Sequence, residues 1–185
     1  NKILYSSLTQ VWPNDFGQKT KNWINTKVRG GFAEDCKLNL IINFIENPKV
    51  KNLQLNWLHK DSKITFYKNL PAFILPEARI NINRDQMIID FNEASLARFG
   101  IGKGQLKISP IFNRMAKASL KLKGQSDLQD ALKFFNHKDL NLISKYRIGT
   151  NGVGKVFFES NFTWPIKPAI KKHEFLWNVN AHGNE

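Results

Sequence analysis

The stretch from Trp12 to Ile45 decides the fold, and it reads WPNDFGQKTKNWINTKVRGGFAEDCKLNLIINFI. Residues 18–29 have helical spacing, and Gly30 and Gly31 are expected to end that helix. The residues after Phe32 alternate between apolar and polar, which is typical of a half-buried strand. One predicted face carries Glu34, Cys36, Leu38, Leu40, Ile42 and Phe44, and the other carries Ala33, Asp35, Lys37, Asn39, Ile41 and Asn43. Such a strand fits an antiparallel sheet that is covered on one side only.

The same alternation recurs along most of the chain, with turn residues such as Arg84-Asp85-Gln86 between the strands. A hairpin turn is predicted at His59 to Ser62, and Leu75-Pro76 is expected to interrupt the strands. Ser126 and Gln129 have the spacing of a capping box that opens a helical pair. We therefore predict a mainly β (α+β) fold, a large curved antiparallel sheet with helical insertions near 18–29 and 126–147.

The composition bounds the size and the partners of the protein. A chain of 185 residues fits a single domain or one segment of a longer array. Its 28 Lys and Arg against 15 acidic residues give a charge of +13, which favours anionic partners, although lysines on the wet faces of strands would give the same excess. Because it begins Asn1-Lys2 and has no apolar run near the roughly 18 residues that span a bilayer, we expect an interior segment whose membrane anchor lies outside it.

Motifs for catalysis or cofactor binding are weak. Residues 149–155 read GTNGVGK, which fits the first seven positions of a phosphate-binding P-loop. However, Val156 stands where a hydroxyl is required, and a strand pattern follows where a helix is needed. The four histidines have no metal-ligand spacing, and the single Cys36 allows no internal disulfide. We predict no catalytic residue, cofactor or metal, and a protein that is not an enzyme.

An ordered set of motifs carries a resemblance to a known family. The pieces are Trp12-Pro13 with Lys21, Trp23 and the glycine pair, Ile64 to Tyr67 with Leu70-Pro71, the turn Arg84-Asp85-Gln86, and Gly124 to Leu132. On these pieces, which span nearly the whole chain, the sequence resembles the YhdP-like central region (DUF3971) of the AsmA/TamB-like bacterial envelope protein superfamily.

The resemblance implies a periplasmic protein of Gram-negative bacteria, attached to the inner membrane by a segment outside this sequence. It also implies that residues 1–185 form one segment of a larger AsmA-like protein, an elongated groove-like array. The apolar groove of such an array would carry phospholipid between the inner and outer membranes, without catalytic residues. The alternation itself agrees with a trough, in which alkyl chains would gain about 0.8 kcal/mol per buried methylene.

The candidate lipid-facing residues are those expected on the apolar side of the strands. They are Leu38, Leu40, Ile42, Phe44, Leu55, Trp57, Ile80, Ile82, Ile89, Phe91, Leu120, Leu122, Phe158, Phe162, Trp164 and Trp177. Polar-face lysines, such as Lys37, Lys63, Lys121 and Lys155, are expected to favour anionic headgroups at about 1 kcal/mol each near a membrane.

Alternatives to a lipid-carrying groove stay open. Alternation does not distinguish an open groove from a closed core, in which the predicted helices cover the same side chains. A basic nucleic-acid-binding module would explain the charge, although the aromatic residues share faces with Leu, Ile and Val and do not form a stacking platform. A purely structural scaffold repeat would bind neither lipid nor nucleic acid.

Overall fold

A computed structural model describes residues 2–10, 22, 25–43, 49–65, 70–111, 115–138, 142–147, 149, 151–166 and 174–184. The strands are β1 (Lys2–Leu4), β2 (Val28–Asn43), β3 (Lys49–Ile64), β4 (Phe73–Asn83), β5 (Met87–Phe91), β6 (Ala94–Leu96), β7 (Phe99–Ser109), β8 (Lys117–Asp127), β9 (Lys155–Pro165) and β10 (Leu176–Asn184). The helices within the described residues include α1 (Tyr5–Gln10), α3 (Leu128–Phe135) and α4 (Leu142–Tyr146).

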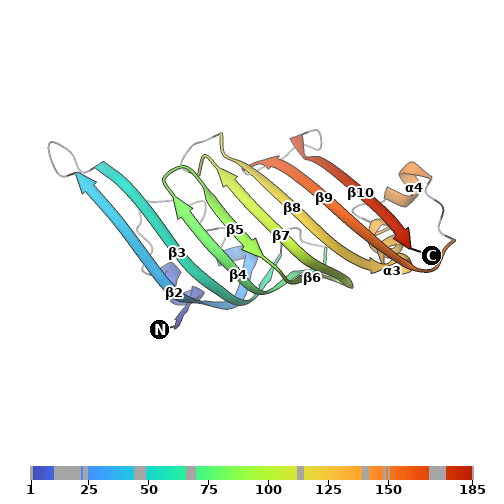
Figure 1. Ribbon diagram of the computed structural model, residues 1–185, viewed down its shortest axis with the longest axis horizontal. Coiled ribbons are helices and arrows are strands. Elements are labelled where there is room, and N and C mark those ends of the chain that lie inside the picture. Colours follow the sequence, from blue (N-terminus) through green and yellow to red (C-terminus); the bar gives the residue numbers. More distant parts are fainter. Residues whose placement is uncertain are drawn as a thin grey trace.

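All of these strands belong to one 10-stranded antiparallel sheet. Its order is β1-β2-β3-β4-β5-β7-β8-β9-β10, and the short β6 pairs with β4 and β7. The strands follow one another across the sheet nearly in chain order, so the fold is a meander with the two chain ends at opposite ends of the sheet (Figure 1). The predicted mainly β fold with one large antiparallel sheet is confirmed.

The strand register aligns apolar side chains into a row that crosses the sheet. Trp57 on β3 lies opposite Ile80 on β4, which in turn lies opposite Ile89 on β5. The row continues through Leu106 on β7, Leu120 on β8, Phe162 on β9 and Trp177 on β10. Because successive side chains of a strand point to opposite faces, this row defines one side of the sheet, which we call the apolar face, and the other side is the polar face.

A bulge in β2 reverses the predicted faces at its start. Asp35 has a positive φ of 51°, and the pairing of β2 with β3 shifts between Glu34 and Lys37. Ala33 consequently lies opposite His59 on the apolar face and is buried, whereas Glu34 takes the polar face. The predicted assignment of Ala33 and Glu34 is therefore wrong, because an extra residue in a strand shifts the alternation.

A second irregularity replaces the hairpin turn predicted at His59 to Ser62. Asp61 has a positive φ of 53°, yet β3 runs on through it to Ile64 and stays paired with β4. His59 and Ser62 therefore both lie on the apolar face, and both are buried. The prediction of a turn was wrong because the polar side chains of His59 and Ser62 lie in the protein interior and not at its surface.

Pro76 lies inside β4, where the sequence predicted an interruption. The strand pairs with β6 through Phe73 and Ile74, and with β5 from Arg79 onward. The residues between these two pairings have no partner strand on that side within the described sheet. A proline, which has no N–H to donate, is tolerated at such a gap.

The turn predicted at Arg84 to Gln86 is confirmed, and there the Asn83 side-chain oxygen accepts hydrogen bonds from the backbone N–H groups of Asp85 and Gln86.

The first predicted helix differs from the structure at its C-terminal end. Residues 22 and 25–27 are helical, but Val28 already begins β2, and Gly30 and Gly31 belong to that strand with φ values of 67° and 85°. Their positive φ explains why both positions are glycine, but the two glycines do not end a helix as predicted. Residues 18–21, 23 and 24 lie outside the described residues.

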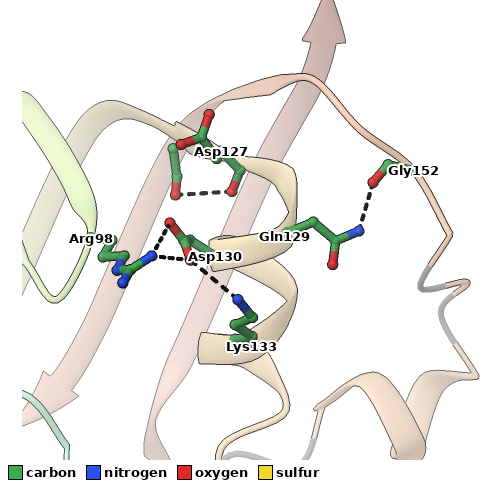
Figure 2. A network of polar contacts seen from close by, with 7 residues as sticks. Arg98, Asp127, Gln129, Asp130, Lys133 and Gly152 are labelled. Carbon is green, nitrogen blue, oxygen red and sulfur yellow. Dashed lines mark hydrogen bonds and ion pairs between the residues drawn. The ribbon is translucent and has the colours of Figure 1, made fainter.

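Helices α3 and α4 fall within the range 126–147, but α3 begins without the predicted capping box. Its N-cap is Asp127, which makes no side-chain capping hydrogen bond. Ser126 donates to the Asp127 carbonyl oxygen, and Gln129 donates to the carbonyl oxygen of Gly152 at 2.6 Å. Figure 2 shows the ion pairs around Asp130 of α3: Arg98, which precedes β7, lies 3.3 Å from its carboxylate, and Lys133 of the same helix lies 3.8 Å from it.

Candidate functional site

The candidate lipid-facing residues lie on the apolar face wherever the structure describes them. In the middle of the sheet Trp57, Ile80, Phe91 and Leu122 are buried and belong to two hydrophobic clusters. The half-buried candidates are Ile42, Leu55, Ile82, Ile89, Leu120, Phe158, Phe162 and Trp164. Phe44 lies outside the described residues.

Among the described residues of this face, large apolar side chains become accessible toward its two ends. On β2, Leu38 is 62% exposed and Leu40 is 43% exposed, and they lie opposite Leu55 and Leu53 of β3. On β10, Trp177 is 42% exposed. Among the described residues, the apolar face is therefore closed in its centre and uncovered at both ends.

Two phenylalanine rings close the centre of the face by lying over glycines. Phe91 on β5 is paired with Gly104 on β7, and its ring occupies the place that a β-carbon at Gly104 would need. Phe158 on β9 is paired with Gly124 on β8 in the same way, and its ring lies 2.8 Å from the position of an added β-carbon. Glycine is required at Gly104 because the Phe91 ring approaches the backbone so closely, and at Gly124 because the Gly100 carbonyl oxygen, 2.3 Å from the position of an added β-carbon, leaves even less room than the Phe158 ring.

Helices α1 and α3 contribute aromatic side chains to the apolar face. Phe99 at the start of β7 makes edge-to-face contacts with Phe134 and Phe135 of α3 and with Phe158 of β9, at centroid distances of 4.9, 6.0 and 5.7 Å. Tyr5 of α1 lies over Ala33 and Trp57 and is buried. Each helix thus covers a local part of the face, beside β2 and β3 for α1 and beside β7 to β9 for α3.

A chain of hydrogen bonds connects α1 to the buried polar residues of β3. Trp57 Nε1 donates to the Tyr5 hydroxyl at 2.7 Å, the hydroxyl lies 2.5 Å from His59 Nδ1, and His59 Nε2 lies 2.6 Å from Ser62 Oγ. These contacts are mutually consistent when Tyr5 donates to Nδ1 and the neutral imidazole donates from Nε2. Sequence reasoning missed this cluster because it placed His59 and Ser62 in an exposed turn.

Burial sets the protonation states in this cluster. It lowers the pKa of His59 from 6.5 to about 4, against a smaller opposing effect of the Asp61 carboxylate. Burial also raises the pKa of Tyr5 above its usual value. The histidine is therefore neutral near pH 7 and the phenol keeps its proton. Since Ser62 is only 2% exposed, the arrangement fastens α1 to the sheet and offers no open face to a substrate.

The polar face concentrates lysines on β7 and β8. Lys103 lies directly opposite Lys123, and Lys121 lies opposite Gln105. Lys123 forms an ion pair with Glu159 of β9, which offsets part of the like-charge repulsion. The four lysines singled out in the sequence, Lys37, Lys63, Lys121 and Lys155, are all exposed on this face.

An open depression of about 320 Å³ lies where α3 meets β9 and β10. Its lining residues are Leu128, Val153, Lys155, Val156, Ala181, His182 and Gly183. The lining is mainly apolar, and Val153 is almost fully exposed at its rim. The depression extends the accessible apolar surface at the β10 end of the sheet.

Among the described residues, no group of three or more His, Cys, Asp or Glu side chains is placed to hold a metal ion. No helix in the described part of the chain is long and apolar enough to cross a membrane. No protein-family model matches the sequence, and neither the curated proteins nor the solved structures yield a match.

Proposed function

We propose that the chain is a non-enzymatic segment of a bacterial envelope protein whose apolar face supports phospholipid acyl chains during transport between the inner and outer membranes. One observation carries the proposal: the apolar face ends at Leu38 and Leu40 on β2 and at Trp177 on β10, large side chains that water can reach. Exposed apolar patches on a folded protein commonly mark a binding surface. The resemblance to the AsmA/TamB-like superfamily supports phospholipid as the ligand.

The proposed contacts lie at the two ends of the face. At the β2 end, Leu38 and Leu40 lie beside Leu55 and Leu53, so an alkyl chain placed there would meet leucine side chains from two strands. Covering them would gain about 25 cal/mol for each Å² of apolar area removed from water. The buried centre supports these ends mechanically, and it is not assigned a lipid contact.

At the β10 end, aromatic residues form the proposed contact surface. Trp164 stacks with Phe175 at a centroid distance of 5.8 Å, and Phe162 contacts the same ring at 5.9 Å. Trp177 lies opposite Phe162 on the neighbouring strand. Aromatic side chains present large apolar area with little rotational freedom to lose, which suits them to binding acyl chains.

The lysines of the polar face support a role beside anionic headgroups. Lys121 and the neighbouring lysines on β7 and β8 are exposed, and few acidic residues lie beside them. Near an anionic bilayer each such lysine contributes about 1 kcal/mol.

A basic nucleic-acid-binding module is the second candidate, and the pairing of Lys103 with Lys123 favours it. It predicts that affinity for a random oligonucleotide falls by orders of magnitude between dilute and physiological salt. Against it, the aromatic side chains Phe158, Phe162 and Trp164 lie on the apolar face, opposite these lysines, and not between them as the rings of single-strand binding sites do.

The test compares two neighbouring substitutions on one strand. Leu40 and Ile41 have similar exposures of 43% and 50%, but successive residues of β2 point to opposite faces. Leu40→Asp is expected to lower the phospholipid extracted per protein from chains purified out of bacterial cells, whereas Ile41→Asp leaves it unchanged. Circular dichroism verifies that both variants are folded. Equal lipid content in the two variants, or lipid-free wild-type protein, would contradict the proposal.

A further inference from the structure

The two edges of the sheet are built differently. At one edge, β2 carries Glu34, Asp35 and Lys37, has two register shifts, and is partly covered by β1. At the other edge, β10 pairs with β9 along all 9 of its residues without a register shift. Within the described residues no further strand pairs with β10 (Figure 1).

β10 also lacks the residues that normally protect an edge strand. Its sequence, LWNVNAHGN, contains no Lys, Arg, Asp, Glu or Pro, in a chain whose net charge is +13. Every other described strand except the short β6 carries at least one charged residue. Natural proteins block strand addition with charges, prolines and bulges, and a long, regular, uncharged edge is open to pairing. Leu176 and Trp177 are, in addition, 64% and 42% exposed.

We propose that β10 is a strand-pairing surface and that its partner is β10 of a second copy of this chain. An antiparallel pair related by a two-fold axis at Asn180 places Asn180 opposite its own copy and pairs the residues on either side of it symmetrically. On the apolar face Trp177 would lie opposite Gly183, and Val179 opposite Ala181, so that each large side chain faces a small one. The two apolar faces would then continue across the junction.

The charge pattern sets how this pairing responds to salt. The paired strands bring no like charges together, because β10 has none. The two copies nevertheless repel each other through their net charges of +13. Repulsion between charges farther apart than the Debye length of about 8 Å is screened at physiological ionic strength. The dimer is therefore expected to strengthen as salt rises from low concentration, in contrast to binding of a polyanion, which salt weakens.

Asn180→Lys tests the interface without harming the protomer. Asn180 lies opposite Glu159 of β9, so a lysine there gains an acidic neighbour within its own chain. In the dimer the two lysines face each other across the axis, and we expect at least a tenfold weaker association. Asn39→Lys, which adds the same charge on β2 at the opposite edge, is the matched control and is expected to dimerise like the wild type. Analytical ultracentrifugation of the whole chain measures both.

Disulfide trapping tests the register, in a Cys36→Ser background that removes the exposed native thiol. Opposed residues in an antiparallel pair have Cα atoms about 4.5–5.5 Å apart, within the range that a disulfide bridges. Asn180→Cys is therefore expected to cross-link two copies. Asn178→Cys lies opposite His182 of the other copy, which leaves the two introduced thiols about 13 Å apart and uncrosslinked.

The outcomes separate this proposal from the lipid-binding one, on which it does not depend. Dimers that Asn180→Lys weakens, together with cross-linking through position 180 alone, establish the β10 pair. A chain that stays monomeric at high concentration overturns the proposal, and so does equal cross-linking at 178 and 180, which would indicate non-specific association. Leu40 and Ile41 lie on β2, so their effect on lipid content reports on the lipid site and not on this edge.

Discussion

Acidification is expected to destabilise the fold through His59. This residue lies on β3, is 3% exposed, and has both ring nitrogens engaged by Tyr5 and Ser62. Its pKa is about 4 in the folded protein, because burial disfavours the charged ring, and 6.5 in the unfolded chain. Protonation would also oblige Nδ1 to give up the hydrogen bond that it accepts from Tyr5.

The direction and size of the effect follow from linkage. Between these pKa values the unfolded chain binds the additional proton and the folded protein does not, so falling pH favours unfolding. The contribution of His59 is complete above about pH 6.5 and is lost progressively as the pH falls toward about 4. The difference of pKa corresponds to about 3 kcal/mol of unfolding free energy.

Urea unfolding measures this effect when the wild type is compared with His59→Gln. The variant cannot titrate at this position, whereas the acidic residues titrate in both proteins. Between about pH 7.5 and about pH 4.5 we expect the wild type to lose about 2 to 3 kcal/mol more than the variant. An equal loss in the two proteins would refute the reasoning, since it would mean that the histidine is not held neutral by the fold.

Two further substitutions test the packing of the sheet and of α3. Gly104→Ala is expected to lower the free energy of unfolding by about 1 to 3 kcal/mol, measured by thermal or urea unfolding, because its β-carbon collides with the Phe91 ring. The control Gly102→Ala, whose β-carbon meets open space, is expected to leave the stability unchanged. Similar effects at both glycines would contradict the packing. Asp130→Ala is expected to lower the unfolding midpoint, because it removes a mostly buried carboxylate that forms ion pairs with Arg98 and Lys133. Glu159→Ala, which breaks an exposed ion pair, is expected to leave the midpoint nearly unchanged. A larger effect at Glu159 than at Asp130 would contradict this account of α3.

The apolar face was predictable from the sequence wherever the strands are regular. Phe158 and Phe162 alternate along β9 as expected, and Trp177 lies opposite Phe162 on β10. The prediction failed at Asp35 and Asp61, where a positive φ shifts the alternation. Nothing in a pattern of apolar and polar residues identifies such a position beforehand, because aspartate is also common in turns and on wet faces.

The division into a buried centre and accessible ends was not predictable. Leu122 and Leu38 have the same side chain and lie on the same face, yet one is buried and the other is 62% exposed. Alternation identifies a face but carries no information on what packs against it. The cluster around His59 was missed for a related reason, because its polar residues resemble a turn until Tyr5 is brought over them by the fold.

Photo-cross-linking from β2 tests the central claim most directly. A benzophenone amino acid is introduced in place of Leu40 or of Ile41, neighbouring residues that point to opposite faces of the strand. Each protein is irradiated with phospholipid vesicles, and covalent lipid adducts are detected by mass spectrometry. The proposal predicts phospholipid adducts at position 40 and few or none at position 41. Equal labelling at both positions, or none at position 40, would contradict a lipid-supporting apolar face.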